Sequence, residues 1–316
     1  MLTNKYEIRF FSALGAIVFI LLAITFFVGR KVINNQVPAP IRIVVNPFDG
    51  IKLTAKSVYV LDARTGKMLY SKNDSERLPL ASLAKVMTAL VAATIAPPTS
   101  TIIITRTAVE TAGDSGLQVG EKWSLKKLTD FSLTSSSNDG ARAIALSLGS
   151  VGNLSDTAAS TTENDFIKEM NWEAKNIGMT ESYYLNDSGL DQSVVQGGAY
   201  GTAKDMATLF DYILKNHPGL MEATREATFK VTSASGVVHT VKNTDAIVNT
   251  IPGLIASKTG YTDLAGGNLV IAFDPEIGRP IIISILGSTE VGRFEDMTKL
   301  VKASLESIQN NIQSSK

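Results

Sequence analysis

The sequence runs Pro79-Leu-Ala-Ser-Leu-Ala-Lys-Val-Met-Thr-Ala-Leu90 and so places Ser82 and Lys85 three positions apart at the start of an apolar, helix-forming run. Residues i and i+3 share one face of an α-helix, so the Lys85 amine can reach the Ser82 hydroxyl. Pro79 favours a helix start near Ser82, where free N–H groups and the positive dipole end stabilise a developing anion. These are the parts of an acyl-transfer site.

Composition limits the other kinds of chemistry. Thirty basic residues balance thirty acidic ones in a chain of 316 residues, so no basic surface for a nucleic acid is expected. There is no cysteine, which excludes disulfides, thiolate catalysis and cysteine-based zinc sites. With two histidines besides, the sequence predicts neither a metal site nor an organic cofactor.

The N-terminus carries an uncharged apolar run from Phe10 to Val28. As a helix it would span about 28 Å, close to the thickness of a bilayer core. No small-residue cleavage pattern follows it, so an uncleaved signal anchor is preferred over a cleaved signal peptide. We therefore expect a cytoplasmic N-terminus at 1–9, a membrane segment at 10–28, a linker at 29–50 with an extended piece at Ile41–Val45, and a globular domain at 51–316.

Strand-like segments lie at both ends of that domain, and helical patterns lie between them. The predicted strands are Ser57–Asp62, Lys67–Ser71, Thr228–Thr232, Val237–Val241, Leu254–Ser257, Leu269–Phe273 and Pro280–Leu286. The predicted helices, besides the Ser82 helix and an amphipathic one from Phe294 to Ile308, are Leu125–Thr134, Asp139–Leu148, Asp165–Ile177 and Ala203–Leu214. The pattern predicts an α+β domain with an antiparallel sheet from both chain ends and an inserted helical lobe, with the site in the cleft between them.

Two short motifs follow Ser82 in order. Ser136-Ser-Asn138 lies between two helical patterns, and Lys258-Thr-Gly260 ends a strand-like segment. Each alone is common as turn or surface chemistry. Together with Ser82 and Lys85, they resemble the penicillin-binding serine acyltransferases, whose motifs are S-x-x-K, S-D-N and K-T-G.

Flanking segments narrow the resemblance to the D-alanyl-D-alanine carboxypeptidases, the low-molecular-mass penicillin-binding proteins. The similar segments are Tyr59–Lys67, Pro79–Ala89, Gly113–Leu117, Ser137–Asp139, Met170–Asn171, Ile177–Met179, Asp187–Asp191 and Lys258–Thr262. The resemblance runs from about Ser57 to Gly287. It implies a β-lactamase/transpeptidase-like fold and a serine peptidase that binds penicillin covalently.

The resemblance also implies catalytic roles. Ser82 would attack the carbonyl of the penultimate D-alanine, and Lys85 would accept the serine proton. Ser136 would relay a proton to the leaving amine, and Asn138 would orient Lys85 and the substrate amide. Because a protonated lysine is no base, Lys85 needs a depressed pKa, which burial and a second cation, Lys258, would supply.

Further residues would hold the substrate. Lys258 and Thr259 would bind its terminal carboxylate, and Gly260 would let the peptide backbone lie against the strand. The family's oxyanion hole maps to the backbone N–H groups of Ser82 and Tyr261. An arginine that faces the substrate carboxylate maps to Arg293.

Alternative functions are considered on specific residues. The stretch Gly113-Asp-Ser-Gly116 resembles a trypsin-like nucleophile loop, but both histidines, His217 and His239, follow it, so that reading is rejected. A class A β-lactamase needs a deacylating glutamate, and Glu181, the candidate, is read as a solvated turn residue. A D-alanine endopeptidase and a catalytically silent wall-binding protein remain alternatives.

The expected protein is thus a single-pass membrane carboxypeptidase whose domain lies outside the membrane. It would trim peptidoglycan stem peptides that end in D-Ala-D-Ala, and β-lactams would inhibit it. Many relatives carry a second, β-rich domain and a C-terminal membrane helix. The segment after Lys258 is accounted for by two strands and a helix, so we expect this chain to lack both and the N-terminal segment to anchor it.

Overall fold

A computed structural model describes residues 4–33, 46–149 and 162–314. The chain divides into two units, Met1–Val45 and Asn46–Lys316, each of which is described by itself. The extended piece expected at Ile41–Val45 lies outside the described residues.

The first unit contains one helix, α1 (Asn4–Ile33). Its apolar part, Arg9–Val28, has a mean hydropathy of 2.7, and its side chains are exposed. Within the described ranges it is the one helix long and apolar enough to cross a bilayer.

The second unit is built on a five-stranded antiparallel sheet with the strand order β10-β11-β12-β1-β2. The strands are β1 (Ser57–Asp62), β2 (Lys67–Lys72), β10 (Leu254–Thr262), β11 (Gly266–Phe273) and β12 (Ile281–Ser288). The prediction of one sheet formed by both ends of the domain is confirmed. β10 is an outer strand of this sheet.

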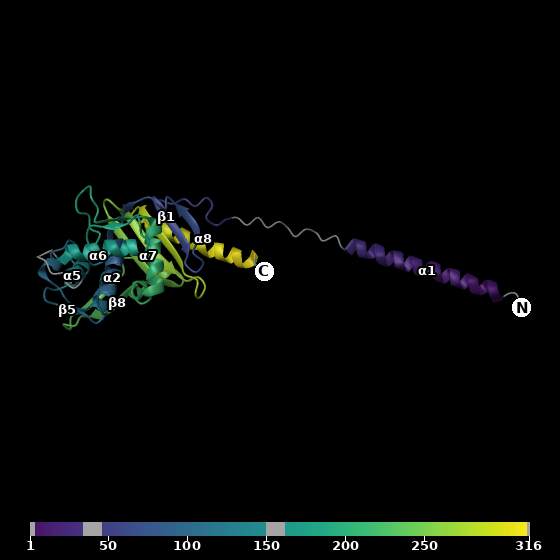
Figure 1. Cartoon of the computed structure of the whole chain (residues 1–316), viewed down its shortest axis with the longest axis horizontal. Helices are drawn as coiled ribbons and strands as arrows, with labels where there is room; N and C mark the ends of the chain where they lie inside the picture. Colours follow the sequence, from purple (N-terminus) through teal and green to yellow (C-terminus); the bar gives the residue numbers. More distant parts are fainter. Residues whose placement is uncertain (1–3, 34–45, 150–161, 315–316) are drawn as a thin grey trace. The chain divides into compact units, whose positions relative to one another are not determined.

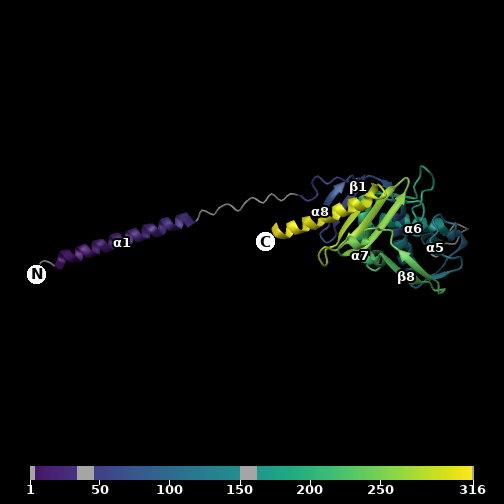
Figure 2. The ribbon, with the colours of Figure 1, turned by 180° about the vertical axis from the view of Figure 1, so that it is seen from behind.

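Helices cover both faces of the sheet (Figures 1 and 2). Successive side chains of β12 alternate between two cores, with Ile281, Ile283 and Ile285 in one and Ile282 and Leu286 in the other. The first core includes Met297 and Leu300 of α8 (Gly292–Ser314), and the second includes Met206 and Phe210 of α7 (Ala203–Asn216).

The helical lobe lies between β2 and β10 in sequence. Its helices are η1 (Ala81–Leu83), α2 (Ala84–Ile95), α3 (Arg106–Val109), α4 (Leu125–Ser135), α5 (Asn138–Leu148), α6 (Thr162–Asn176), η2 (Glu222–Arg225) and η3 (Val248–Thr250). Its strands form three small sheets: β4 (Thr101–Ile103) with β5 (Lys122–Ser124), β8 (Thr228–Thr232) with β9 (Val238–Lys242), and β3 (Leu78–Pro79) with β7 (Ala199–Gly201) and β6 (Tyr183–Tyr184). The sequence predicted the long helices and the strands β8 and β9. It did not predict the two- and three-residue strands β3 to β7, which are too short to show a periodic pattern.

One predicted strand end is wrong. The sequence placed Lys258-Thr-Gly260 after a strand at Leu254–Ser257, whereas β10 continues through the motif to Thr262. The continuation is stabilised by β11, since Thr259 pairs with Leu269 and Tyr261 with Gly267. The motif is therefore fixed in a sheet and does not lie in a turn.

Asp296, at the start of α8, links this helix to Thr54 and Ala55, which precede β1. Its buried carboxylate accepts hydrogen bonds from Thr54 N (3.1 Å), Thr54 Oγ1 (3.0 Å), Ala55 N (2.8 Å) and Ser288 Oγ (3.0 Å). Removal of the acceptor would leave these donors unsatisfied.

We expect Asp296→Ala to lower the free energy of unfolding by about 2–4 kcal/mol, because buried donors lose their partner. Asp296→Asn keeps one acceptor oxygen and should cost less. Urea denaturation followed by circular dichroism in detergent measures both, with the exposed neighbour Glu295→Ala as the control. Equal stability of the alanine variant and the control would contradict this assignment.

Candidate active site

The turn that carries Ser82 is held in a strained conformation. Ala81 has φ +49°, a region that costs a non-glycine residue about 1–3 kcal/mol and persists only where the surroundings enforce it. The Asn268 side chain of β11 enforces it by donating to Pro79 O (3.0 Å) and Leu80 O (3.1 Å). The half-buried Ser82 thus lies in η1 at a fixed place beside the sheet.

Lys85, in the first turn of α2, contacts the Ser82 hydroxyl as the spacing predicted. Its Nζ lies 2.9 Å from Ser82 Oγ and 2.8 Å from Ser188 O, and the side chain is 1% exposed. Burial lowers the pKa of Lys85 to about 7, against the opposing charges of Asp187 and Asp139. The amine can therefore be neutral near neutral pH, as a base must be.

Ser136 and Lys258 form a second serine–lysine pair. Ser136 caps α4 with φ +60°, and its Oγ lies 2.9 Å from Lys258 Nζ, which also donates to Thr259 O (2.8 Å). Burial lowers the pKa of Lys258 well below the ordinary value of lysine, and the charges of Lys85 and Arg293 lower it further. The two serine–lysine pairs therefore belong to one electrostatic site.

The predicted cause of the Lys85 shift needs correction. The sequence assigned it to burial together with the positive charge of Lys258. Burial is the main cause, and the charge of Lys258 is not among the causes that act on Lys85. Repulsion between two such amines is mutual, so the pair holds its second proton weakly.

The Lys258-Thr-Gly260 strand passes directly over the serine turn. A Cβ added at Gly260 would lie 2.9 Å from Leu80 O and 3.3 Å from Leu83 N. The glycine is therefore required by the approach of β10 to the turn, in addition to any room it leaves for a substrate. Thr259, the residue before Gly260, is fixed by a 2.5 Å hydrogen bond between its Oγ1 and Thr244 Oγ1.

Tyr261 and Arg293 lie next to each other at the end of the strand. Tyr261 is 44% exposed, and the Arg293 guanidinium lies 6.0 Å from the centre of its ring. Arg293 is buried and donates from Nη1 to Gly260 O (2.8 Å), while its Nε has no hydrogen-bond partner among the described residues. Burial lowers the pKa of Arg293. The structure thus brings the predicted arginine to the Lys258 strand.

Asn138 lies at the start of α5, two residues after Ser136. Its Nδ2 donates to Ala112 O (2.7 Å), and its buried Oδ1 has no partner within the described ranges. Lys85 is bound by Ser82 and Ser188, so the prediction that Asn138 orients this amine finds no hydrogen bond to support it. The Asn138 carbonyl oxygen is thus a buried acceptor without a partner among the described residues.

The sequence missed residues that act through main-chain atoms or as supports. Ser188 supplies the carbonyl that binds Lys85, Asn268 fixes the serine turn, and Thr244 fixes Thr259. The sequence singled out segment Asp187–Asp191 only because it resembles the family. The contact of Ser188 with Lys85 is made by a backbone carbonyl, which any residue type carries, so it could not be predicted from the side chain. Asn268, a polar residue in an otherwise apolar strand, carried the one signal that could have been noticed.

The residues considered for the alternative functions, Glu181, His217 and His239, have contacts away from the predicted site. Glu181 is exposed and forms an ion pair with Arg77 (2.6 Å). His239 is buried against Glu121, 2.7 Å from its Oε1, and His217 caps α7. No hydrogen bond or ion pair joins any of these three to a predicted site residue in the described part of the chain.

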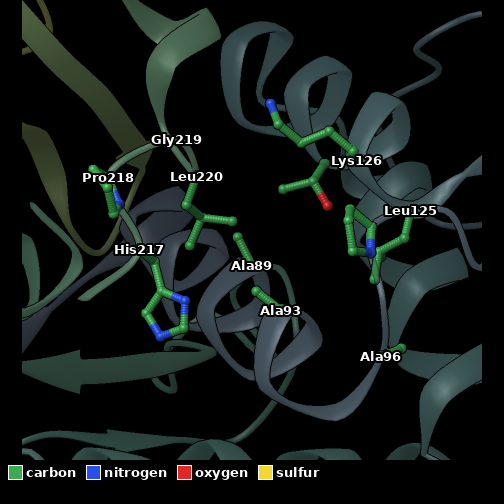
Figure 3. Close-up of a pocket in the computed structure, with 11 residues that line it drawn as sticks. Ala89, Ala93, Ala96, Leu125, Lys126, His217, Pro218, Gly219 and Leu220 are labelled. Carbon is green, nitrogen blue, oxygen red and sulfur yellow. The ribbon is translucent and has the colours of Figure 1, made fainter.

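A separate apolar pocket of about 280 Å³ lies between α2, α4 and the loop after α7 (Figure 3). Its walls include Ala89, Ala93 and Leu125, with Lys126 and His217 also lining it. None of the predicted site residues lines it. It is therefore distinct from the site formed by the two serine–lysine pairs.

Comparison with known proteins identifies the family. The family model for D-alanyl-D-alanine carboxypeptidase matches residues 43–289. The chain is 28% identical to D-alanyl-D-alanine carboxypeptidase DacF of Bacillus subtilis over 78% of this chain and 61% of that protein. It is 29% identical to a D-alanyl-D-alanine endopeptidase of Pseudomonas aeruginosa over 79% of this chain and 76% of that protein.

A solved structure agrees. The ampicillin-bound crystal structure of a penicillin-binding protein from Listeria monocytogenes is similar with a TM-score of 0.67 and 28% identity, covering 80% of this chain and 98% of that one. The fold is thus the penicillin-binding-protein and transpeptidase fold. With the two motif serines and two motif lysines hydrogen-bonded in pairs, the chain belongs to the D-alanyl-D-alanine carboxypeptidase family of serine-type hydrolases.

Proposed function

We propose that this protein is a membrane-anchored, serine-type D-Ala-D-Ala carboxypeptidase that removes the terminal D-alanine from peptidoglycan stem peptides through an acyl-enzyme. The observation that carries the proposal is the pairing of Lys85 with Ser82 and of Lys258 with Ser136 in one buried electrostatic site. β-Lactams would acylate the same serine. No metal or organic cofactor is required by this chemistry.

Acylation begins at Ser82. Neutral Lys85 takes the hydroxyl proton as Oγ attacks the carbonyl carbon of the penultimate D-alanine. The oxyanion is received by the backbone N–H groups of Ser82 and Tyr261. When the carbon–nitrogen bond breaks, Ser136 relays the proton held by Lys85 to the leaving amine, which returns Lys85 to its neutral form. The Asn138 carbonyl accepts a hydrogen bond from the substrate amide.

The substrate carboxylate completes the site. It binds Lys258 and Thr259, and Arg293 adds positive charge from α8. An anion beside Lys258 favours its protonated form and so leaves the proton deficit of the pair on Lys85. Binding of the correct substrate would thereby generate the base that attacks it.

Deacylation needs one water molecule. Lys85 would take its proton as the oxygen attacks the acyl carbonyl, and the proton would return to Ser82 as the ester bond breaks. Glu181, engaged with Arg77 on the surface, does not supply the extra base that rapid β-lactam turnover requires. We therefore expect a β-lactam to remain bound to Ser82.

The location follows from α1. We propose that residues 10–28 span the membrane once, with 1–9 in the cytoplasm, and that residues 29–50 link this anchor to a domain outside the membrane. The apolar composition of residues 10–28, which carry no charged side chain, supports this. Its position would hold the enzyme near newly made peptidoglycan.

We expect the purified full-length protein to be labelled covalently by fluorescent penicillin, and Ser82→Ala to abolish the label because no nucleophile remains. Gel fluorescence and mass spectrometry of the modified peptide measure this. The exposed Ser75→Ala is the matched control and should label fully. Persistent labelling of the Ser82 variant would exclude it as the nucleophile.

Gly260→Ala should slow penicillin acylation by about 10²-fold, since the added methyl displaces the strand from the serine turn and misplaces the reacting groups. The rate of label formation at saturating and limiting penicillin measures it. Gly219→Ala is the control, because its Cβ would meet nothing within 4 Å. Equal rates for the two variants would show that the close approach of β10 is unimportant.

A second candidate is a D-alanine endopeptidase, which the similarity to the Pseudomonas aeruginosa protein of that name favours. The carboxypeptidase should release D-alanine from a monomeric pentapeptide at least tenfold faster than it cleaves a cross-linked dimer, since Lys258, Thr259 and Arg293 would bind a free terminal carboxylate. Chromatography of both digests decides between them. The reverse preference would assign the endopeptidase.

A further inference from the structure

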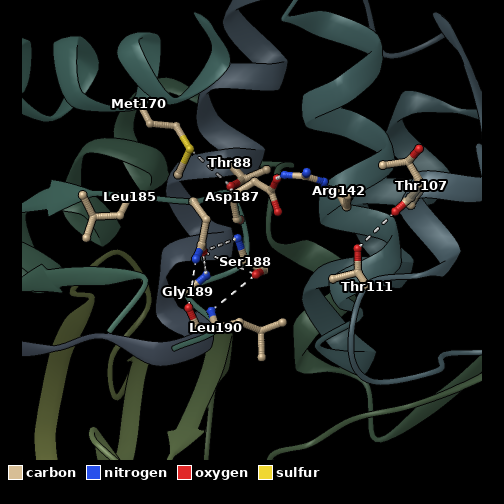
Figure 4. A network of polar contacts seen from close by, with 12 residues as sticks. Thr88, Thr107, Thr111, Arg142, Met170, Leu185, Asp187, Ser188, Gly189 and Leu190 are labelled. Atoms are coloured by element: carbon tan, nitrogen blue, oxygen red, sulfur yellow. Dashed lines mark hydrogen bonds and ion pairs between the residues drawn. The ribbon is translucent and has the colours of Figure 1, made fainter. Parts of the chain in front are cut away.

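Behind Lys85 lies an ion pair that the proposed mechanism does not use. Arg142 of α5 donates from Nη1 to Asp187 Oδ2 at 3.2 Å (Figure 4). The Asp187 side chain is 2% exposed and that of Arg142 is 21% exposed. A carboxylate this deeply buried is tolerated only with a positive partner, so the two residues depend on each other.

The main chain around Asp187 is fastened to α2. Asp187 O accepts a 2.6 Å hydrogen bond from Thr88 Oγ1, and the next carbonyl, Ser188 O, accepts the 2.8 Å hydrogen bond from Lys85 Nζ. Thr88 and Lys85 are three residues apart and share one face of the helix. Two successive carbonyls of the segment are thus docked on the turn that carries the catalytic amine.

The segment also touches the serine turn. Gly189 has φ +78°, and a Cβ there would lie 1.8 Å from Ala81 O, so only glycine fits. Asn186 Oδ1 accepts from Gly189 N (2.7 Å) and stabilises the bend. The position of Asp187 is therefore rigidly related to both Ser82 and Lys85.

We propose that Asp187, held by Arg142, is a positioning residue for Lys85: it fixes the Ser188 carbonyl against the amine and places one negative charge behind it. This inference rests on the proposed function, in which Lys85 is the base. On this proposal, the ion pair between Arg142 and Asp187 helps to set the pH range in which Ser82 can be acylated.

The electrostatics agree with this assignment. Burial lowers the pKa of Lys85. The negative charges of Asp187 and Asp139 raise it, and Asp187 has the larger effect of the two. Burial raises the pKa of the Asp187 carboxyl, and Arg142, then Lys85, oppose that. Without Asp187 the pKa of Lys85 would fall further.

The charged groups that face these two residues are few in the described part of the chain. Lys85 faces Asp187 from the 186–189 segment, Asp139 from α5 and Lys258 from β10. Asp187 faces Arg142 and Lys85. Asp139 is engaged by Ser115, whose N and Oγ lie 3.2 and 2.9 Å from Oδ2, so its role in fixing the 112–117 loop is separate.

The test is the pH dependence of penicillin acylation of the full-length protein. Wild type should show an acid limb with a midpoint near pH 7, the pKa of Lys85, because the protonated amine cannot act as a base. Asp187→Asn keeps the shape and an acceptor for Arg142 but removes the charge. Its midpoint should fall by about one pH unit, the low end of the shift that a nearby opposite charge produces.

Asp187→Glu restores the carboxylate and should return the midpoint toward that of the wild type. If Asp187 had only a structural role, restoring its charge would not move the midpoint. Glu222→Gln, in the exposed ion pair with Arg225, is the control and should leave the midpoint unchanged. If Asp187→Asn does not fold, the double variant R142Q/D187N removes both buried charges and should still lower the midpoint.

An unchanged midpoint in the folded asparagine or double variant, with or without a slower rate, overturns the inference. Failure of the proposed function looks different, since the wild-type protein itself would then not be labelled. A midpoint that falls in Asp187→Asn and recovers in Asp187→Glu supports the assignment.

Discussion

The close approach of β10 to the serine turn is the constraint on which the rest of the site depends. Gly260 allows it, because any Cβ there would meet Leu80 O. Asn268 fixes it from the neighbouring strand by binding Pro79 O and Leu80 O. Since Ser82 lies in that turn and Lys258 on that strand, the distance between the nucleophile and the predicted carboxylate site is set by backbone packing and does not depend on flexible side chains.

Burial is the physical source of the chemistry. Two lysines that are each 1% exposed cannot both keep a full charge without cost, and the fold offers them mainly neutral partners: two serine hydroxyls and two backbone carbonyls. The two amines are therefore poised to release protons, which an exposed lysine is not. In the proposed mechanism a negatively charged substrate would compensate this cost at one lysine and leave the other as base, so that binding and activation would be one event.

Some features of the fold and the site were predicted from the sequence, and others were not. The contact between Ser82 and Lys85 follows from helical spacing and was predicted correctly, as was the sheet formed from both ends of the domain. The extension of β10 through Lys258 was missed, because the strand-like pattern ends at Ser257 and the pairing with β11 that continues the strand arises only in the folded sheet. Burial of Lys85, predicted alongside the charge of Lys258, is the main cause of its lowered pKa, but its extent arises from tertiary packing and cannot be read from neighbours in sequence.

The two serine–lysine pairs also come from separate parts of the fold. Ser82 and Lys85 lie at the junction of η1 and α2, whereas Ser136 caps a helix of the lobe and Lys258 lies in the sheet. In a partly unfolded chain each lysine would return to water and regain its ordinary proton affinity, and Ser82 would lose its base. If Ser82 is the nucleophile, as we propose, it is therefore reactive only where lobe and sheet are packed together, and the chemistry is confined to the fully folded domain.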